Sequence, residues 1–176
     1  GVGAIMVVSD DGGRNWQYRG HVARCPDGDT AFGYSEWVLH ETPSGRLVAF
    51  IRCQLRGDRT AYLHTARSSD DGRSWSEPAS QPVWGYPHHV LSMPSGRLLL
   101  SYGYRRQPYG LRCRLIDAEC ERLGEAEELI LRDDGGHWDL GYPHAALLPD
   151  GRALMVYYFC DRPDGQLYIA ASIVEE

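Results

Sequence analysis

Lysine is absent from this sequence, because all 18 basic residues among its 176 residues are arginines. A chain without lysine has no Walker-type phosphate loop and no lysine to form a Schiff base. The formal net charge of −6 argues against nucleic acid or an anionic membrane surface as the main partner. No apolar run approaches the roughly 18 residues of a membrane-spanning helix, so no membrane span is predicted.

Helical periodicity is also missing. The best helical candidate, residues 118–128, is expected to be a loop. The 20 glycines and 10 prolines divide the chain into short apolar runs, a pattern typical of an all-β protein. The five cysteines form no CxxC pair, so we predict no metal site and interpret them as small buried apolar residues: Cys25, Cys53, Cys113, Cys120 and Cys160.

One repeat dominates the sequence. A Pro-Ser/Asp-Gly-Arg turn begins at Pro43, Pro94 and Pro149, with spacings of 51 and 55 residues, and an apolar run follows each turn. A second apolar segment precedes each turn, over residues 34–41, 87–92 and 142–148. The repeat therefore predicts three β-hairpins of the same kind.

A second motif, S-x-D-x-G-x-x-W, lies between the hairpins in two copies 59 residues apart. Its Ser and Asp oxygens can accept turn N–H groups, its Gly supplies a positive φ, and its Trp can fold back over the turn. A degenerate third copy is expected near 117–124. The residues of the two full copies are Ser9, Asp11, Gly13 and Trp16, and Ser68, Asp70, Gly72 and Trp75.

This eight-residue element resembles the Asp-box of sialidases and related BNR-repeat proteins. The resemblance implies an all-β fold, a β-propeller of four-stranded antiparallel blades, of which the chain would form about half of a six-bladed ring. We expect a half blade over 1–30, blades over 31–82 and 83–135, and a closing blade over 136–176. Missing N-terminal blades or a second copy of the chain would complete the ring, and the resemblance slightly favours a secreted or periplasmic location.

The first strand of each blade lines the channel of a propeller, and functional groups gather there and on the loops at one rim. The polar residues at such positions are Glu36, His88, His89, Tyr142 and His144, with Arg52, Arg105 and Arg106 at the ends of the second strands.

The sialidase resemblance implies a role for several of these residues. Tyr142, which opens the last blade, would be the nucleophile, and Glu36 would be its base. Arg52, with Arg105 or Arg106, would bind the carboxylate of an acidic sugar, and Arg112 is a further option. The implied activity is that of an exo-sialidase-like glycosidase that needs no cofactor.

The sequence also leaves alternatives open. The Arg and the Asp acid/base that sialidases carry in early blades have no counterpart here, which also favours a non-catalytic propeller that binds glycans or proteins. A channel containing His88, His89 and His144 would suit a uronate polysaccharide lyase. Each predicted role also has a purely structural interpretation. Glu36 and Arg52 could simply pair with each other, and Tyr142 could be an ordinary aromatic residue at the rim. Residues 137–139 could form a substrate-facing loop, although a plain connecting loop is the favoured interpretation, and residues 157–159 are interpreted as sheet packing.

Overall fold

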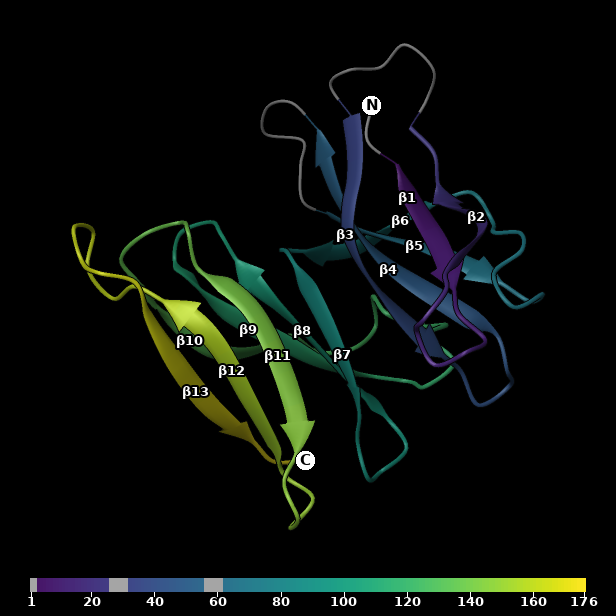
Figure 1. Ribbon diagram of the computed structural model, residues 1–176. Helices are drawn as coiled ribbons and strands as arrows, with labels where there is room; N and C mark the ends of the chain where they lie inside the picture. The colour runs from purple at the N-terminus through teal and green to yellow at the C-terminus, as the bar shows by residue number, and fades with distance from the viewer. Residues whose placement is uncertain (1–2, 26–31, 56–61) are drawn as a thin grey trace. The chain divides into compact units, whose positions relative to one another are not determined.

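The computed structural model describes residues 3–25, 32–55 and 62–176, and within these ranges it contains strands and turns but no helix. The chain divides into two compact units, residues 1–81 (unit 1) and residues 82–176 (unit 2). The strands are β1 (Ala4–Val8), β2 (Gln17–Ala23), β3 (Phe32–Glu41), β4 (Leu47–Leu55), β5 (Tyr62–Ser68), β6 (Ala79–Trp84), β7 (His88–Ser92), β8 (Leu98–Tyr104), β9 (Tyr109–Ile116), β10 (Leu129–Gly135), β11 (Gly141–Leu147), β12 (Ala153–Phe159) and β13 (Tyr168–Val174) (Figure 1).

These strands form four sheets, with strand orders β1-β2, β3-β4-β5-β6, β7-β8-β9-β10 and β11-β12-β13. Their spans are 4–23, 32–84, 88–135 and 141–174. Within unit 2, β11 lies beside β7, so the first strands of two sheets are neighbours (Figure 1). The chain is therefore built from successive antiparallel sheets, each made of residues that are contiguous in sequence.

The three hairpins close in the same way. In the first, the Thr42 amide donates to the Arg46 carbonyl and the Gly45 amide donates to the Thr42 carbonyl, both at 2.8 Å. The same two bonds recur at 93–97 and 148–152, and the turn glycines all have φ between +80° and +87°. Because a left-handed φ is cheap only for glycine, this residue in the repeat determines where each hairpin turns.

The strands after these turns form the core. In β8 every residue from Leu98 to Gly103 is buried, and β4 is buried from Val48 to Cys53. These central strands are covered on both faces, which explains their continuous apolar runs. Unit 2 packs Leu99, Leu111 and Met155 into one cluster, whereas unit 1 packs Ile51 with smaller residues such as Val22 and Ala49.

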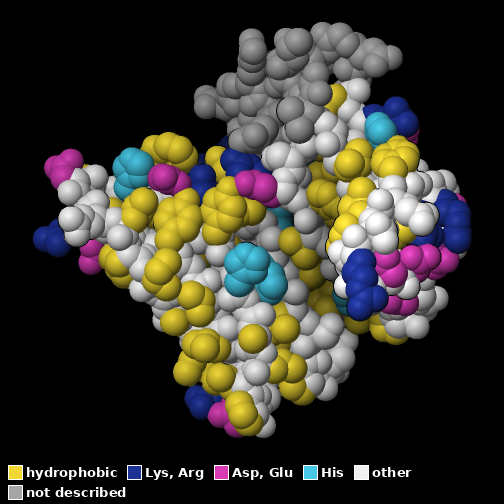
Figure 2. Space-filling view, viewed as in Figure 1, with side chains coloured by type: hydrophobic (Ala, Val, Ile, Leu, Met, Phe, Trp, Pro, Cys, Tyr) yellow, Lys and Arg dark blue, Asp and Glu magenta, His cyan; other side chains and the backbone are white. Residues whose placement is uncertain are grey.

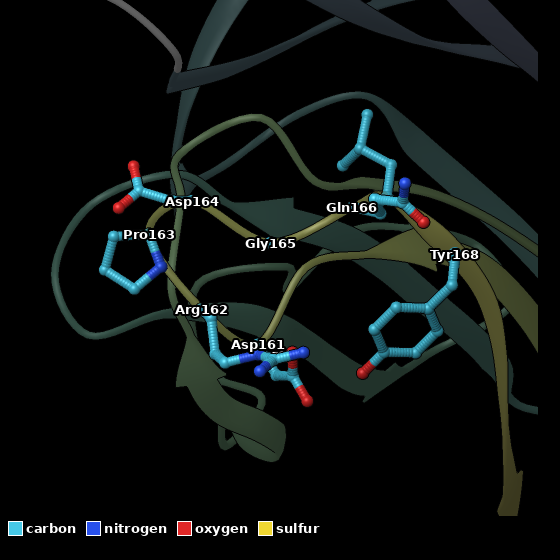
Figure 3. A pocket seen from close by; sticks show the side chains of 8 residues that line it. Asp161, Arg162, Pro163, Asp164, Gly165, Gln166 and Tyr168 are labelled. Carbon is cyan, nitrogen blue, oxygen red and sulfur yellow. Dashed lines mark ion pairs between the residues drawn. The ribbon is translucent and has the colours of Figure 1, made fainter.

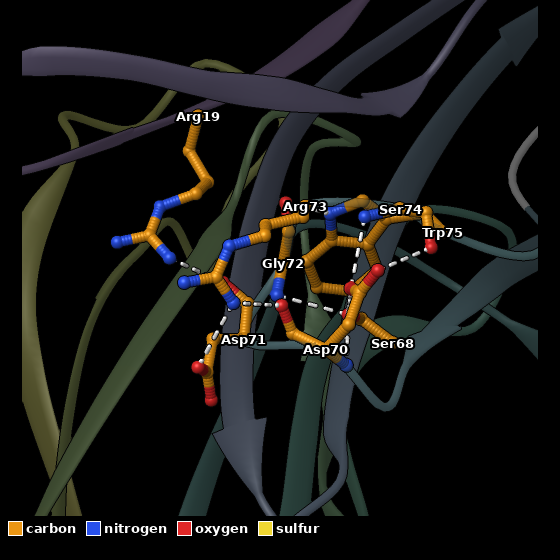
Figure 4. Close-up of polar contacts among 8 residues, drawn as sticks. All are labelled: Arg19, Ser68, Asp70, Asp71, Gly72, Arg73, Ser74 and Trp75. Atoms are coloured by element: carbon orange, nitrogen blue, oxygen red, sulfur yellow. Dashed lines mark hydrogen bonds and ion pairs between the residues drawn. The ribbon is translucent and has the colours of Figure 1, made fainter.

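The turn at 68–75 shows what the second motif does (Figure 4). Ser68 Oγ donates to Asp70 Oδ1 at 2.8 Å and accepts the Gly72 amide at 2.9 Å. Asp70 in turn accepts the Ser74 amide at 2.9 Å and the Ser74 hydroxyl at 2.6 Å. The Trp75 indole N–H donates back to the Gly72 carbonyl at 3.1 Å, so side chains of the motif supply hydrogen-bond partners to the backbone of its own turn.

The turn at 9–16 repeats this network. Ser9 Oγ donates to Asp11 at 2.8 Å and accepts the Gly13 amide at 2.8 Å. Asp11 accepts the Asn15 amide at 2.9 Å, and the Trp16 indole donates to the Gly13 carbonyl at 3.1 Å. Two turns with the same residue pattern thus have the same geometry.

The degenerate third copy keeps the turn by other means. Asp117 accepts the Glu121 amide at 3.1 Å and the Arg122 amide at 3.0 Å. Counted from the strand pairing, Cys120 takes the glycine position with φ +58°, and the buried Leu123 takes the tryptophan position. A carboxylate one position earlier therefore replaces the Ser-Asp pair, and residues 118–128 form a loop, as expected.

Candidate functional site

The predicted site residues are divided between the two units. Unit 1 holds Glu36 and Arg52. Unit 2 holds the remaining candidates, namely His88, His89, Arg105, Arg106, Arg112, Tyr142 and His144. The proposed partnership of Glu36 with Tyr142 would join the two units, so it stays a prediction.

Glu36 and Arg52 form an ion pair between β3 and β4, with the Arg52 guanidinium donating to Glu36 Oε2. Their strands are paired at Ser35 with Arg52 and at Trp37 with Ile51, and the register shifts between these pairs, so Glu36 lies in a β-bulge. A bulge re-aims a side chain, which brings Glu36 over the end of β4. The Arg52 side chain is 10% exposed and that of Glu36 is 40% exposed.

Arg105, which follows the end of β8, contacts three groups from the segment before β11 and from β12. Its Nε donates to the Leu140 carbonyl at 2.9 Å, and its Nη2 donates to the Tyr158 hydroxyl at 2.7 Å. The same Nη2 lies 3.5 Å from Asp139 Oδ1. The Arg105 side chain is only 5% exposed, so strand β12 and the segment before β11 fix its orientation.

Tyr158 connects the two charged groups. Its hydroxyl accepts from Arg105 and donates to Asp139 Oδ1. Burial, together with the hydrogen bond to Asp139, raises the pKa of Tyr158 well above its ordinary value. The hydroxyl therefore stays protonated near neutral pH and holds the Arg105 guanidinium and the Asp139 carboxylate in position.

Aromatic rings surround this ion pair. The Arg105 Cζ atom lies 5.0 Å from the ring centroid of Tyr86, 5.6 Å from that of Trp138 and 5.8 Å from that of Tyr142. The Tyr142 and Tyr158 ring centroids are 5.8 Å apart. Trp138 and Tyr142 are 50% and 39% exposed. We call this group the Arg105 cluster, and its members are Tyr86, Arg105, Trp138, Asp139, Tyr142 and Tyr158.

The backbone at the start of β11 is unusual. Gly141 has φ +117° and Tyr142 has φ +51°, and the pairing of β11 with β12 shifts register between Gly141 and His144. A tyrosine in the left-handed region is uncommon, and such strain clusters at functional sites. Gly103 permits the close packing here, because a Cβ at that position would lie 2.8 Å from the Tyr86 carbonyl and 3.1 Å from the Leu140 carbonyl.

The other two arginine candidates point elsewhere. Arg106 is exposed and its Cζ lies 4.0 Å from the Trp84 ring centroid. Arg112 is buried, donates to the Pro108 carbonyl at 3.3 Å and lies over the Tyr104 ring. Arg105 is therefore the candidate that the strand register brings to Tyr142.

Two of the three histidine candidates lie together. The ring centroids of His89 on β7 and His144 on β11 are 5.0 Å apart, and His89 Nε2 lies 3.3 Å from the Ala145 carbonyl oxygen. Burial lowers the pKa of His89. His88 is buried, and its ring centroid lies 6.0 Å from that of Tyr102. Histidine side chains gather among apolar side chains where β7 and β11 meet (Figure 2).

A hollow of about 730 Å³ lies elsewhere in unit 2, at the loop between β12 and β13 (Figure 3). It is lined by the single segment from Asp161 to Tyr168, and none of the predicted site residues lines it. In the described residues no group of three or more His, Cys, Asp or Glu side chains is arranged to hold a metal ion. No helix there could cross a membrane.

Four members of the Arg105 cluster were not among the predicted site residues: Tyr86, Trp138, Asp139 and Tyr158. The segment with Trp138 and Asp139 was interpreted as a connecting loop in preference to a substrate-facing one, and Tyr158 was interpreted as sheet packing. The alternation of β12 contained a signal for Tyr158, because Tyr157 and Phe159 are buried in the core and the intervening residue must face the other side. For Asp139, the only signal in the sequence was its position two residues before the first strand of the last sheet. No local pattern would have linked it to an arginine 34 positions away.

Comparison with known proteins supports the fold. A protein of unknown function from Dyadobacter fermentans is 41% identical, with a TM-score of 0.85 over 95% of this chain and 44% of its own. An alpha-L-arabinanase from Penicillium chrysogenum, complexed with arabinobiose, is 13% identical, with a TM-score of 0.63 over 98% of this chain and 55% of its own. An alpha-L-arabinofuranosidase from Fusarium graminearum, also with arabinobiose, is 16% identical, with a TM-score of 0.60 over 98% of this chain and 54% of its own.

The chain thus has a β-propeller fold, as predicted, and it spans about half the length of the solved structures that it matches. No protein-family model matches it, and no curated protein does. The narrower resemblance to sialidases stays a prediction.

Proposed function

We propose that this chain is part of a carbohydrate-active β-propeller of the glycoside hydrolase type, and that the Arg105 cluster is its sugar-binding site. The observation that carries the proposal is the combination of a tyrosine-bridged Arg105–Asp139 pair with two exposed aromatic rings, Trp138 and Tyr142. Sugar sites combine planar charged groups, which bind hydroxyls, with aromatic faces, which pack against C–H groups.

The solved structures of similar fold support this class of ligand. Two of them are named as an arabinanase and an arabinofuranosidase and hold arabinobiose, although their identity of 13–16% relates them to this chain through the fold alone. Because the chain spans about half of their length, the complete binding site would include further sheets, from a longer polypeptide or from a second copy of this chain.

Two chemistries fit the proposal. In the first, Tyr142 is the nucleophile, Glu36 is its base, and Arg52 and Arg105 bind the carboxylate of an acidic sugar, as the sialidase resemblance implies. In the second, two carboxylates act on an uncharged sugar, and Asp139 would be the contribution of unit 2. A binding propeller without catalysis would use the same aromatic and polar groups.

The test uses the longest natural form of the protein with a panel of arabino-oligosaccharides, galacto-oligosaccharides, aryl sialosides and uronate polymers. We expect binding by calorimetry, and an Asp139→Ala, Trp138→Ala double variant should lose it. Asp150→Asn is the matched control, because Asp150 forms an exposed ion pair with Arg152 in the same unit. If no sugar on the panel binds, the proposed function is wrong.

The same panel separates the chemistries. Turnover that Tyr142→Phe abolishes would support the tyrosine nucleophile, whereas turnover that depends on Asp139 would support the carboxylates. An unsaturated product that absorbs in the near ultraviolet and depends on His89 or His144 would identify a lyase instead. Binding without turnover would identify a binding propeller.

A further inference from the structure

We propose that the Arg105 cluster recognises an uncharged sugar through two neighbouring hydroxyl groups, and that it does not bind a sugar carboxylate. This inference rests on the proposed function and names its ligand class. It departs from the acidic sugar that the arginine pattern suggested in the sequence.

The charge balance is the first argument. A carboxylate binds more strongly to a cation whose charge is not already compensated by another carboxylate. Arg105 lies 3.5 Å from Asp139 and shares the Tyr158 hydroxyl with it, so the pair is neutral as a whole. In unit 1, Arg52 is likewise paired with Glu36. Arg52 and Arg105, two of the three arginines predicted for the carboxylate clamp, thus already have a carboxylate partner.

Access is the second argument. Asp139 is the more exposed member of its pair, at 39% of its side chain against 5% for Arg105. An approaching ligand therefore meets the anion first. A sugar carboxylate would be repelled by this anion, whereas a sugar hydroxyl can donate a hydrogen bond to it.

The atoms that the cluster leaves to a ligand are the third argument. Within the described part of the chain, the hydrogen bonds of Arg105 use Nε and Nη2, and those of Asp139 use Oδ1 as the acceptor. An acceptor, Oδ2, and a donor, Nη1, remain on the two charged side chains. A pair of vicinal hydroxyls can donate to the first and accept from the second.

The aromatic rings supply the rest of the recognition. Trp138 and Tyr142 both approach the Arg105 guanidinium and are both exposed, so two exposed aromatic rings lie beside the polar pair. A sugar ring has C–H groups on its faces and hydroxyls on its rim, and this arrangement complements both. Because the ion pair is held by Tyr158 and by the Leu140 carbonyl, it needs little reorganisation on binding.

The experiment uses the longest natural form of the protein and a matched pair of ligands, trigalacturonate and its methyl ester, which differ in charge at the same positions. Uncharged arabino- and galacto-oligosaccharides are tested beside them. Affinity is measured by calorimetry and by NMR shifts of the Trp138 indole, with Asp139→Asn as the test variant and Asp150→Asn as the control. The Asn side chain keeps the size of Asp139 and removes its charge.

We expect the wild-type chain to bind uncharged sugars and to prefer the ester over the acid. Asp139→Asn should weaken the uncharged ligands by about tenfold or more, since a hydrogen bond to a charged acceptor is lost, and it should improve binding of the acid because Arg105 is no longer compensated. Asp150→Asn should change neither affinity.

A wild-type preference for the acid would overturn the inference and leave the proposed sugar site standing. An Arg106→Gln variant would then show whether the exposed arginine on Trp84 binds the carboxylate. Binding of uncharged sugars that Asp139→Asn leaves unchanged, with the indole shift of Trp138 also unchanged, would overturn it as well. No binding of any sugar would remove the proposed function itself.

Discussion

Each unit contains an arginine–carboxylate pair, but the two pairs have different surroundings. In unit 1, Arg52 on β4 meets Glu36 in a bulge of β3, and the contact is made between adjacent strands. In unit 2, Arg105 meets Asp139 across two sheets, and Tyr158 bridges the pair. Exposed aromatic rings accompany the second pair.

This difference shows that an arginine–carboxylate pair does not by itself identify a binding site. A pair between neighbouring strands is a common way to satisfy charges at a sheet end. The pair in unit 2 also has a strained tyrosine backbone and an exposed aromatic face, and these features are what mark it as a candidate site. The two pairs should therefore respond differently to substitution.

The largest effect is expected from Gly103→Ala, because a Cβ would meet the Tyr86 and Leu140 carbonyl oxygens and the backbone of Gly141. Overpacking of this kind should lower the free energy of unfolding by about 3 kcal/mol. It should also displace the Arg105 cluster, without touching the Arg52 pair. Denaturant titration measures the first effect, and sugar binding measures the second.

Gly96→Ala is the matched control for that variant. Its φ of +81° makes the substitution strained, but no atom lies within 4 Å of the new Cβ. The expected cost is about 1 kcal/mol from the backbone alone. If Gly103→Ala costs no more than Gly96→Ala, the backbone around the cluster can yield to an added methyl group and the packing there is loose.

The next effect comes from removing each arginine. Arg105→Met should cost about 2 kcal/mol of unfolding free energy, because the Leu140 carbonyl and the Tyr158 hydroxyl lose a donor and Asp139 loses its ion-pair partner. Arg52→Met should cost about 1 kcal/mol, since Glu36 is 40% exposed and can be solvated instead. Equal losses for the two variants, measured by thermal and chemical unfolding, would contradict the distinction between the two pairs.

A smaller effect is expected from Tyr158→Phe, which removes the bridge and leaves both charges. The variant should lose about 1 kcal/mol, as for an ordinary hydrogen bond, and its alkaline behaviour should change. Because the folded pKa of Tyr158 is raised, its contribution is present below about pH 10 and is lost as the pH rises further. Tyr158→Phe should flatten the stability profile above about pH 10, and a profile of unchanged slope would contradict the assignment.

The smallest effect concerns the two turns of unit 1, at 9–16 and 68–75, whose hydrogen bonds are made within the motif itself. Hydrogen bonds from Asn15 lower the pKa of Asp11 to about 2, and those from Ser74 lower the pKa of Asp70 to about 2. A lowered folded pKa stabilises the chain above about pH 4, and the contribution is lost as the pH falls toward about 2. Asp11→Asn and Asp70→Asn should reduce the slope of unfolding free energy against pH in this range, and Asp150→Asn serves for comparison in unit 2.

Much of this arrangement could be predicted from neighbouring residues. The Pro-Ser/Asp-Gly-Arg repeat located three hairpins, and the S-x-D-x-G-x-x-W repeat located two turns, because each motif satisfies its hydrogen bonds within a few residues. The all-β fold class followed from the same repeats and from the lack of helical periodicity. Pro43 and Ser68 thus carry structural information that needs no long-range contact to be interpreted.

The candidate site could not be predicted in this way, because its residues are close in space but far apart in the sequence. Arg105 and Arg106 are adjacent and point to different surroundings, and only the strand register decides which of them reaches Tyr142. The Arg105 partners Leu140 and Tyr158 lie 35 and 53 residues further along the chain. Local sequence therefore determined the strands and turns, whereas the partners of Arg105 came together only when β8, β11 and β12 packed, because an ion pair between distant residues leaves no periodic trace in the chain.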